Sequence, residues 1–215
     1  MIGKGESRCL SNGTWSDVSC VFVKTCHEAD ILLLDTSGPI KIKPIGSEDV
    51  VTVSCERKQN DVYTVIGHDL ANRTHINGPE DSFSYVLPIE YTIPLDLAIG
   101  VVNVSSECEQ FIKFECFEVG AQYNSFRTRT GEQADYFAGG VKGRGDNNCA
   151  CHINNTCINQ GVCNCRLNTP EWYADTGYNR YKEDLPITAF LAGDTGHRGE
   201  EAYITIGSLK CKGES

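Results

Sequence analysis

The chain has 215 residues, 12 cysteines and a net charge of −10, from 19 Lys and Arg against 29 Asp and Glu. A domain that binds nucleic acid or anionic membrane normally carries a cluster of Lys and Arg, and the sequence has no such cluster. The sequence also has no run of 18 apolar residues that would span a membrane. The composition therefore predicts no nucleic-acid partner and no direct membrane insertion, and the acidity favours solubility.

The first 20 residues differ in character from the rest. Cys9 to Cys20 predicts two short β-segments around a turn at Asn12-Gly13. The segment resembles the last third of a sushi (complement control protein) module, which ends in a cysteine, a Gly-x-Trp and a final cysteine. We predict a sushi-like C-terminal remnant over residues 1–20, with a hairpin closed by Cys9 and Cys20 as the alternative. A second domain is expected over 21–215.

From Cys26 onward the pattern is mostly strand and turn. Alternating or β-branched runs predict strands in five places: 40–43, 50–55, 61–66, 82–93 and 97–104. Helical periodicity is weak and is strongest over 94–100. Near the end, Glu201 to Cys211 predicts a strand that returns to the core. The middle of the chain is therefore expected to be β-rich, with enough apolar residues for one core.

Five cysteines fall within 17 residues, spaced C-x-C-x5-C-x5-C-x-C from Cys149 to Cys165. Asparagines dominate the residues between them, so this stretch cannot hold itself together by hydrophobic burial. Either a metal or disulfides must order it. Zinc prefers C-x2-C pairs, which are absent, and His152 beside Cys151 is more typical of a loop residue than of a ligand. The region from Ser125 to Thr195 is expected to be a loop-rich subdomain held by crosslinks.

Glycosylation sequons favour the disulfide alternative. Four asparagines fit N-x-[ST], namely Asn12, Asn72, Asn103 and Asn154. Together with 12 cysteines they predict a secreted or cell-surface glycoprotein, located outside the cell. In such a protein all the cysteines are expected to form disulfides: Cys9, Cys20, Cys26, Cys55, Cys108, Cys116, Cys149, Cys151, Cys157, Cys163, Cys165 and Cys211.

A series of motifs in fixed order resembles a known family. The motifs are Val53-Ser-Cys55, Tyr63-Thr-Val-Ile-Gly-His-Asp69, Cys108-Glu-Gln-Phe-Ile-Lys-Phe-Glu-Cys116, the cysteine cluster, Trp172, Asp175-Thr-Gly177, Leu185-Pro-Ile-Thr188, Gly193-Asp-Thr195 and Gly207-Ser-Leu-Lys-Cys211. Over about 21–213 the chain looks like a fibrinogen C-terminal-like domain of the contactin-associated protein (neurexin-IV) type.

This resemblance implies an α+β fold: an antiparallel β-sheet with a few short helices, followed by a loop-rich, disulfide-stapled C-terminal subdomain. It implies an extracellular adhesion or recognition module without catalysis, and the sequence has no HExxH, GxSxG or P-loop motif. It also suggests the pairs Cys26–Cys55 and Cys108–Cys116. Six further cysteines would then allow 15 connectivities, with Cys211 reaching back into the cluster.

Arg144-Gly145-Asp146 is an RGD tripeptide in a glycine-rich stretch, which predicts an exposed loop. Such a tripeptide presents a guanidinium and a carboxylate to an integrin, although it also arises by coincidence. Lectin-type relatives of the resembled family carry an Asp-x-Asp calcium loop before their paired cysteines. Only Asp146 stands at the matching place here, so a calcium ion is an open alternative to having no cofactor.

Two other sets of residues could bind a ligand. Trp172, Tyr173 and Tyr178 could form an aromatic platform for a sugar or a protein, unless Trp172 covers the disulfide cluster as a small core. Carboxylates of the loop-rich half could supply calcium ligands or serve only as turn-forming surface residues: Asp175, Glu183, Asp184 and Asp194.

These observations predict a non-enzymatic extracellular adhesion or recognition module. Its partner would be a protein or glycan on a cell surface or in the matrix. Two alternatives remain open. One is a calcium-dependent carbohydrate-binding lectin of innate immunity. The other is a self-assembling structural subunit of an extracellular filament or matrix, in which the domain associates with copies of itself.

Overall fold

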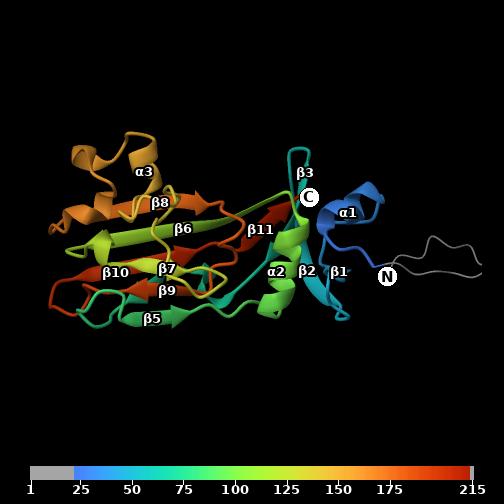
Figure 1. Ribbon diagram of the computed structural model, residues 1–215, viewed down its shortest axis with the longest axis horizontal. Helices are drawn as coiled ribbons and strands as arrows, with labels where there is room; N and C mark the ends of the chain where they lie inside the picture. The colour runs from blue at the N-terminus through green and yellow to red at the C-terminus, as the bar shows by residue number, and fades with distance from the viewer. Residues whose placement is uncertain (1–21, 214–215) are drawn as a thin grey trace, which may run out of the picture.

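The computed structural model describes residues 22–213, which form two antiparallel sheets with a few short helices (Figure 1). The helices are α1 (Cys26–Ile31), α2 (Leu95–Val104) and α3 (Ala150–Ile153), with 3-10 turns η1 (Asp69–Ala71), η2 (Ala121–Tyr123), η3 (Ile158–Gln160) and η4 (Asn164–Leu167). The strands are β1 (Ile40–Ile42), β2 (Val51–Lys58), β3 (Asp61–Ile66), β4 (Thr74–Ile76), β5 (Tyr85–Pro88), β6 (Glu107–Phe117), β7 (Ser125–Arg127), β8 (Tyr173–Asn179), β9 (Ala189–Ala192), β10 (Glu201–Ile206) and β11 (Leu209–Lys212).

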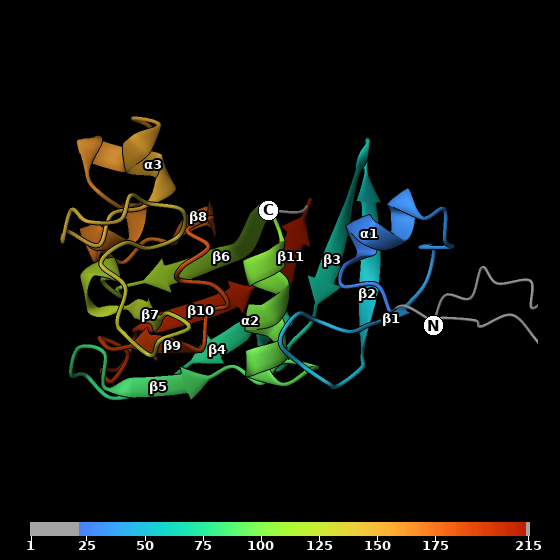
Figure 2. The same cartoon turned by 45° about the vertical axis from the view of Figure 1, so that its right-hand side comes forward.

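Strand β6 is the centre of the larger sheet (Figures 1 and 2). It pairs with β8 along one side, and with β10 and then β11 along the other. β4 lies on the far side of β10 from β6. β3, β2 and β1 follow in that order on the far side of β11. Every pairing is antiparallel, so the predicted β-rich, antiparallel architecture is confirmed.

The predicted strand from Glu201 to Cys211 is present but is divided by a bulge. Ile206 pairs with Ile112 and Lys210 pairs with Glu109, so four steps along one strand match three steps along β6. The extra residue falls next to Gly207, and such a β-bulge bends a strand and increases its twist. β10 and β11 are therefore one long strand in two parts, which pass different neighbours.

Glycine is required at the bulge. A Cβ atom added to Gly207 would lie 2.9 Å from the Cβ of Phe111. The Gly207 carbonyl, freed from the regular ladder, accepts hydrogen bonds from Gln110 Nε2 at 3.1 Å and from His68 Nε2 at 2.9 Å. Two buried side chains thus satisfy a backbone group that the bulge would otherwise leave unpaired.

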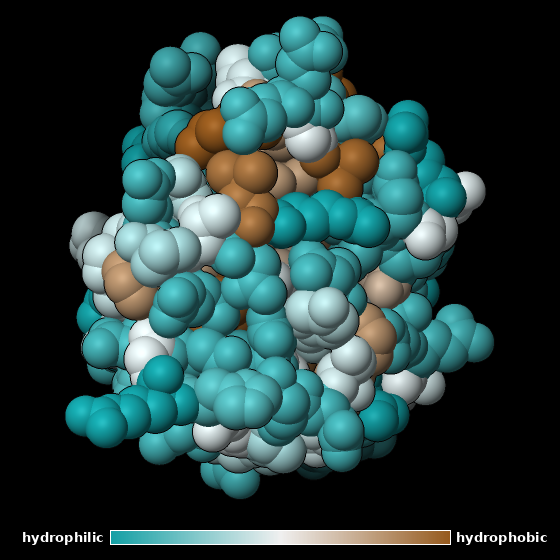
Figure 3. All heavy atoms as spheres, turned by 90° about the vertical axis from the view of Figure 1, so that its left-hand side faces the viewer, coloured by the Kyte–Doolittle hydropathy of each residue, from teal (hydrophilic) through white to brown (hydrophobic). Residues whose placement is uncertain are grey.

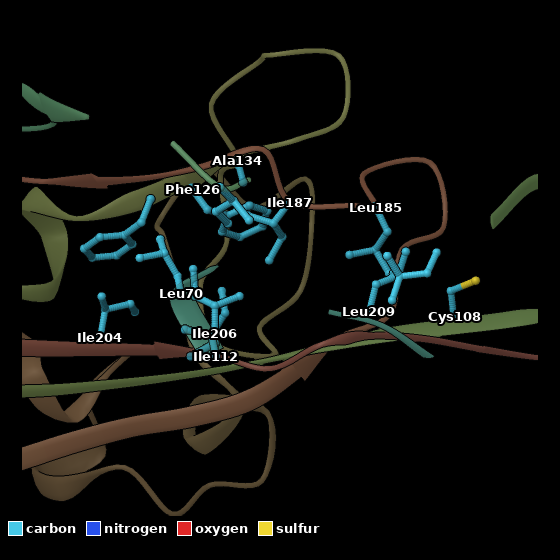
Figure 4. Packing of buried hydrophobic residues seen from close by; sticks show 14 of the residues in the cluster. Leu70, Cys108, Ile112, Phe126, Ala134, Leu185, Ile187, Ile204, Ile206 and Leu209 are labelled. Atoms are coloured by element: carbon cyan, nitrogen blue, oxygen red, sulfur yellow. The ribbon is translucent and has the colours of Figure 1, made fainter. Parts of the chain in front are cut away.

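The core lies between the larger sheet and the three-stranded sheet β5-β9-β7. Alternation along β6 buries every second residue, so Ile112 and Phe114 point inward. Figure 4 shows Ile112, Ile204 and Ile206 of the larger sheet facing Phe126 and Ile187 of the opposite layer. The opposite face of the larger sheet, called here the outer face, carries the odd-numbered residues of β6, of which Glu107 is exposed and the others are half-buried.

Helix α2 begins within the predicted helical stretch, but the prediction of a strand over 97–104 was wrong. Leu97, Ala98, Val101 and Val102 are buried, a spacing that matches one face of a helix. Burial of this face outweighs the β-propensity of the valines. At Gly100, a Cβ atom would lie 3.2 Å from Pro44 Cβ, so the helix packs closely on the segment after β1.

The loop-rich subdomain is also present. Between Arg127 and Tyr173 the regular elements are α3, η3 and η4, each of three or four residues. Five disulfides link the ten described cysteines. Cys9, Cys20 and Asn12, with the predicted sushi-like segment, lie outside the described residues. No helix within 22–213 is long and apolar enough to cross a membrane.

Candidate recognition surfaces

Three disulfides build the loop-rich subdomain. Cys149–Cys163 and Cys151–Cys157 are nested and close loops with sequence separations of 14 and 6 residues. Cys116–Cys165 then joins this unit to β6 across 49 residues. The cluster was expected to fasten a core-poor subdomain to the sheet through Cys211. The structure fastens it through Cys116–Cys165 instead.

The expected pair Cys26–Cys55 is confirmed, and the pair Cys108–Cys116 is wrong. Both of the latter cysteines lie on β6, where eight residues of strand separate their Cα atoms by about 26 Å. A disulfide requires a Cα–Cα distance below about 7 Å. Cys108 instead pairs with Cys211 directly across the β6–β11 ladder, so Cys211 does not reach the cluster.

Buried Asp175 organises the chain around η4. One carboxylate oxygen accepts a hydrogen bond from Asn164 N and the other accepts one from Cys165 N, each at 2.8 Å. Burial raises the pKa of Asp175, against the lowering effect of these backbone donors. Its oxygens are therefore directed at the protein.

The other three predicted carboxylates also have protein partners. Asp184 accepts from the Tyr136 hydroxyl at 2.9 Å and from Lys142 Nζ at 2.7 Å, and exposed Glu183 lies 3.3 Å from the same ammonium group. Asp194 accepts from Gly120 N at 2.6 Å. Asp175, Asp184 and Asp194 thus hold loops in place, and the structure does not gather the four carboxylates around one point.

The RGD tripeptide lies on an exposed loop, where Gly143 and Gly145 have positive φ angles. Its two charged side chains face each other, with Arg144 Nε 3.2 Å from one carboxylate oxygen of Asp146. The second oxygen of Asp146 accepts a hydrogen bond from Asn148 Nδ2 at 2.7 Å. An integrin would have to break this internal ion pair, and integrin binding stays a prediction.

The same contacts bear on calcium. Burial raises the pKa of Asp146, but hydrogen bonds from Asn148 and Arg144 outweigh it and lower the pKa below its ordinary value. The nearby Asp135 carboxylate accepts from the backbone N–H groups of Gly143 and Gly145. The charge that would attract a calcium ion is thus already matched by protein donors.

Within residues 22–213, two groups of three side chains bring possible metal-ligand atoms within 4.8 Å of one another. In the first, Cys149 and Cys163 share a disulfide, and disulfide sulfur is not the thiolate that binds metal. The second joins Glu80, His197 and Glu200 at the surface. His197 Nδ1 lies 2.9 Å from Glu80 and 3.4 Å from Glu200, so one imidazole nitrogen contacts both carboxylates.

The most prominent candidate surface is on the outer face of the larger sheet. Six aromatic side chains from β4, β6, β8, β10 and the residue before β8 project there, and we call them the aromatic face: His75, Phe111, Phe117, Trp172, Tyr178 and Tyr203. Trp172 keeps 49% of its surface exposed while its ring contacts those of Phe117 and Tyr203, with centroids 5.6 and 5.9 Å away. It therefore lies on this sheet face as an exposed aromatic residue.

Cations lie against the same rings. The guanidinium carbon of Arg73 is 3.2 Å from the centroid of Tyr203, and that of Arg180 is 4.9 Å from the centroid of Tyr178. Arg73 also forms an ion pair with Glu115 at 2.9 Å. Burial raises the pKa of Glu115, but Arg73 and Lys113 together lower it below its ordinary value. The cation–π contacts and ion pairs hold the side chains of the aromatic face in fixed orientations.

The structure places two of the three predicted platform residues on the same face, although six residues of strand, about 20 Å, separate them and they contact different rings. Trp172 and Tyr178 are on the outer face, whereas Tyr173 pairs across the ladder with buried Cys116 and packs against the core from the other side of β8. Side chains alternate along a strand, so Tyr173 and Tyr178, five residues apart, must point in opposite directions. Sequence reasoning missed His75, Phe111, Phe117 and Tyr203, although period-two alternation along β6 and β10 would have placed three of them on one face.

A second exposed apolar area lies at one end of the molecule. Figure 3 shows hydrophobic side chains gathered in the upper part of that end, at the height of α3, above a mostly hydrophilic surface. Ile153 and Ile158 are the exposed isoleucines of the disulfide-linked loops. Asn154 lies between them in the sequence. Like Asn72 and Asn103 it is exposed, as an acceptor of N-linked glycan must be, and glycosylation stays a prediction.

No known family model matches the chain. The chain is, however, 29% identical to contactin-associated protein 1 of Homo sapiens over 234 aligned residues, which cover 97% of the chain. The rat and mouse proteins of the same name are 29% and 28% identical over the same share. The chain spans only 17% of the length of these relatives.

These similarities agree with the resemblance inferred from the motif order. The chain is similar along nearly its whole length to one part of contactin-associated protein 1. The fibrinogen-like and sushi-like assignments are finer statements than this similarity supports.

Proposed function

We propose that this chain is a non-enzymatic extracellular recognition module and that the aromatic face is its protein-binding surface. The observation that carries the proposal is the half-exposed Trp172, whose ring contacts those of Phe117 and Tyr203 on the outer face of the sheet. Aromatic residues and arginine are enriched in protein interfaces, and they dominate the residues whose truncation abolishes binding. Arg73 and Arg180 lie at the aromatic face in that role.

Location and partner follow from independent observations. Five disulfides in 192 described residues are typical of proteins that fold outside the reducing cytosol. The relatives are named for their association with contactin. We therefore infer a cell-surface partner, with a contactin as the first to test.

The fold family and the N-terminal module that the motifs resemble are also proposed. We infer that residues 21–213 adopt the fibrinogen C-terminal-like fold and that residues 1–20 form the end of a sushi-like module. The order of the motifs, and the similarity to the relatives over 97% of the chain, support the first. An experimental structure that describes residues 1–20 would test the sushi-like assignment.

Catalysis is not part of the proposal. The ten described cysteines are joined in disulfides, so none is available as a nucleophile. Buried His68 hydrogen-bonds the Gly207 carbonyl and the Leu70 N–H group, which occupies both ring nitrogens in structural roles. These contacts support a binding role over an enzymatic one.

The experiment is a binding titration against an immobilised contactin ectodomain. We expect Trp172→Ala to weaken binding by tenfold or more, because a buried interface tryptophan typically contributes over about 2 kcal/mol. Leu33→Ala is the matched control, since Leu33 is a large, strongly exposed apolar residue at the opposite end of the sheet, after α1. Circular dichroism of both variants checks that the fold is retained.

Two results would contradict the proposal in different ways. Absence of binding by the unaltered chain would exclude a contactin as partner. Tight binding that Trp172→Ala leaves unchanged would show that the aromatic face is not the surface used.

A further inference from the structure

A groove interrupts the outer face where β8 ends. β8 pairs with β6 only from Gln110 onward, so the first three residues of β6, from Glu107 to Glu109, have β11 on one side and no strand on the other among the described residues. The segment after β8 crosses this uncovered edge and leaves a groove of about 210 Å³. Its lining comes from β3, β11, the start of β6 and the segment after β8: Tyr63, Ser106, Glu107, Cys108, Glu109, Arg180, Lys182, Lys210 and Lys212.

The groove concentrates positive charge in a strongly acidic chain. Its lining has four cations and two carboxylates, a balance of +2, whereas the whole chain carries −10. The cations come from two directions: Lys210 and Lys212 project from β11, and Arg180 and Lys182 come from the segment that crosses the edge. A negatively charged group in the groove would therefore meet cations on opposite walls.

The partners of these lysines are more exposed than the lysines themselves. Lys210 and Lys212 retain 32% and 24% of their side-chain surface, while their partners Glu56 and Asp61 retain 44% and 51%. Exposed ion pairs of this kind contribute little to stability, typically 0–1 kcal/mol. An incoming anion can thus replace Glu56 or Asp61 at small cost, because the displaced carboxylates return to water.

Lys182 differs from the other three cations. Its ammonium group donates to the Ser105 carbonyl, and no carboxylate within residues 22–213 forms an ion pair with it. Two of its three N–H donors are therefore available to a ligand.

We propose that this groove binds one sugar residue that carries a carboxylate, at the end of a cell-surface glycan. The lysines and Arg180 would pair with the carboxylate, while Glu107, Glu109 and Ser106 accept hydrogen bonds from sugar hydroxyls. The ring of Tyr63, 5.9 Å from Lys212 Nζ, offers an apolar face to the sugar. The volume of the groove is below the roughly 300–1,000 Å³ of pockets that bury drug-sized ligands, so the groove has room for a single sugar residue.

The carboxylates around the groove favour a sugar acid over a polyanion as its ligand. A sulfated polysaccharide would place many charges along the sheet, where Glu56, Asp61, Glu107 and Glu109 surround the cations. Like charges in contact at an interface oppose binding. A ligand with one negative charge and several hydroxyls fits this mixed lining better, because hydroxyls donate to carboxylates.

The test is an NMR titration of the full chain with sialyllactose, lactose and a heparin-derived oligosaccharide. We expect sialyllactose to bind, with shifts in the amides of Glu107 and Lys210, and we expect lactose to bind at least about tenfold more weakly because it lacks the carboxylate. Lys210→Gln and Lys182→Gln should each weaken sialyllactose binding by about tenfold. Lys41→Gln is the control, since Lys41 is an exposed lysine of β1 outside the groove.

Three outcomes would overturn the proposal. These are equal binding of lactose and sialyllactose, sialyllactose binding that neither groove variant weakens, and binding of the heparin fragment without binding of sialyllactose. Arg180 lies at both surfaces, but the contactin experiment and this one fail independently, because Trp172 lies outside the groove and Lys210 lies outside the aromatic face.

Discussion

The Cys116–Cys165 disulfide should contribute more to stability than the Cys151–Cys157 disulfide of the cluster. It is the bond that joins the loop-rich subdomain to β6, and it closes a sequence separation of 49 residues, against 6 for Cys151–Cys157. In the chain-entropy account, restraint of the unfolded chain is worth about 4 kcal/mol for the longer loop and about 2 kcal/mol for the shorter one. Burial acts in the same direction, since Cys116 and Cys165 are buried while Cys151 and Cys157 are half-buried.

The assay compares two double variants in guanidinium unfolding followed by circular dichroism. We expect Cys116→Ala with Cys165→Ala to lower the free energy of unfolding by about 2 kcal/mol more than Cys151→Ala with Cys157→Ala. Hydrogen exchange should show early loss of protection around η4 in the first variant, because hydrogen bonds to Asp175 and to the Ala174 carbonyl, without a covalent link, then hold it to β8.

An equal or larger loss of stability in the Cys151/Cys157 variant would refute this reasoning. It would mean that loop length and burial do not determine what each crosslink contributes. A change in the slope of free energy against denaturant would instead reveal an altered unfolded state, so both the slope and the midpoint are to be compared.

Three further predictions concern single positions. Burial lowers the pKa of His68, so protonation favours the unfolded chain and stability should fall as pH drops from 7 through the ordinary histidine pKa near 6.5. His68→Gln should reduce this fall in melting temperature, and His75→Gln, at an exposed histidine, is the control. Gly207→Ala should cost about 1–3 kcal/mol in thermal unfolding, because the new Cβ would meet Phe111, and Gly38→Ala, which has open space around it, should cost less. Excess calcium or a chelator should leave the melting temperature unchanged, because Asp146 is already paired with Arg144 and Asn148; a rise with calcium would show that the ion displaces those partners.

Local patterns in the sequence were enough to predict about half of the strands, but β6, the centre of the larger sheet, and its neighbour β8 were not among them. Alternation and β-branched runs identified β1, β2 and β3, and they placed the long C-terminal strand, because each of these has one buried and one exposed face. Helix α1 was missed although its signal was present. Thr25 accepts from Glu28 N at 3.1 Å, the N-cap contact that a Thr-x-x-Glu sequence predicts.

The disulfide pairing shows what local patterns cannot supply. Recognising Cys108 to Cys116 as one strand would have excluded a bond between its ends, but it could not have identified Cys211 and Cys165 as the partners. Those partners depend on which strands become neighbours, and that is set by the packing of the whole sheet. The groove beside β6 depends in the same way on where β8 stops pairing.

The candidate site was predicted in part for the same reason. Trp172 and Tyr178 were grouped as a possible aromatic platform, with Trp172 as a cover of the disulfide cluster left as the alternative. Tyr203 and His75 come from distant segments that reach the side of Trp172 only through the register of β10 and β4. Tyr173 was grouped with its neighbours in sequence, whereas strand alternation places it against the core.

The disulfides near the two ends of residues 22–213 also determine how this region responds to mechanical tension. A force applied at those ends reaches Cys26–Cys55 and Cys108–Cys211 within a few residues, and the bonds carry it past the chain segments that they enclose. Only the 53 steps from Cys55 to Cys108 lie between the two bonds on the loaded path. Complete unravelling would therefore release about 180 Å of chain, roughly a quarter of the length of all 192 residues fully extended. Strand β8, the loop-rich subdomain and β10 lie outside that path, so the aromatic residues that they carry would stay covalently tethered to β6 while the domain is stretched.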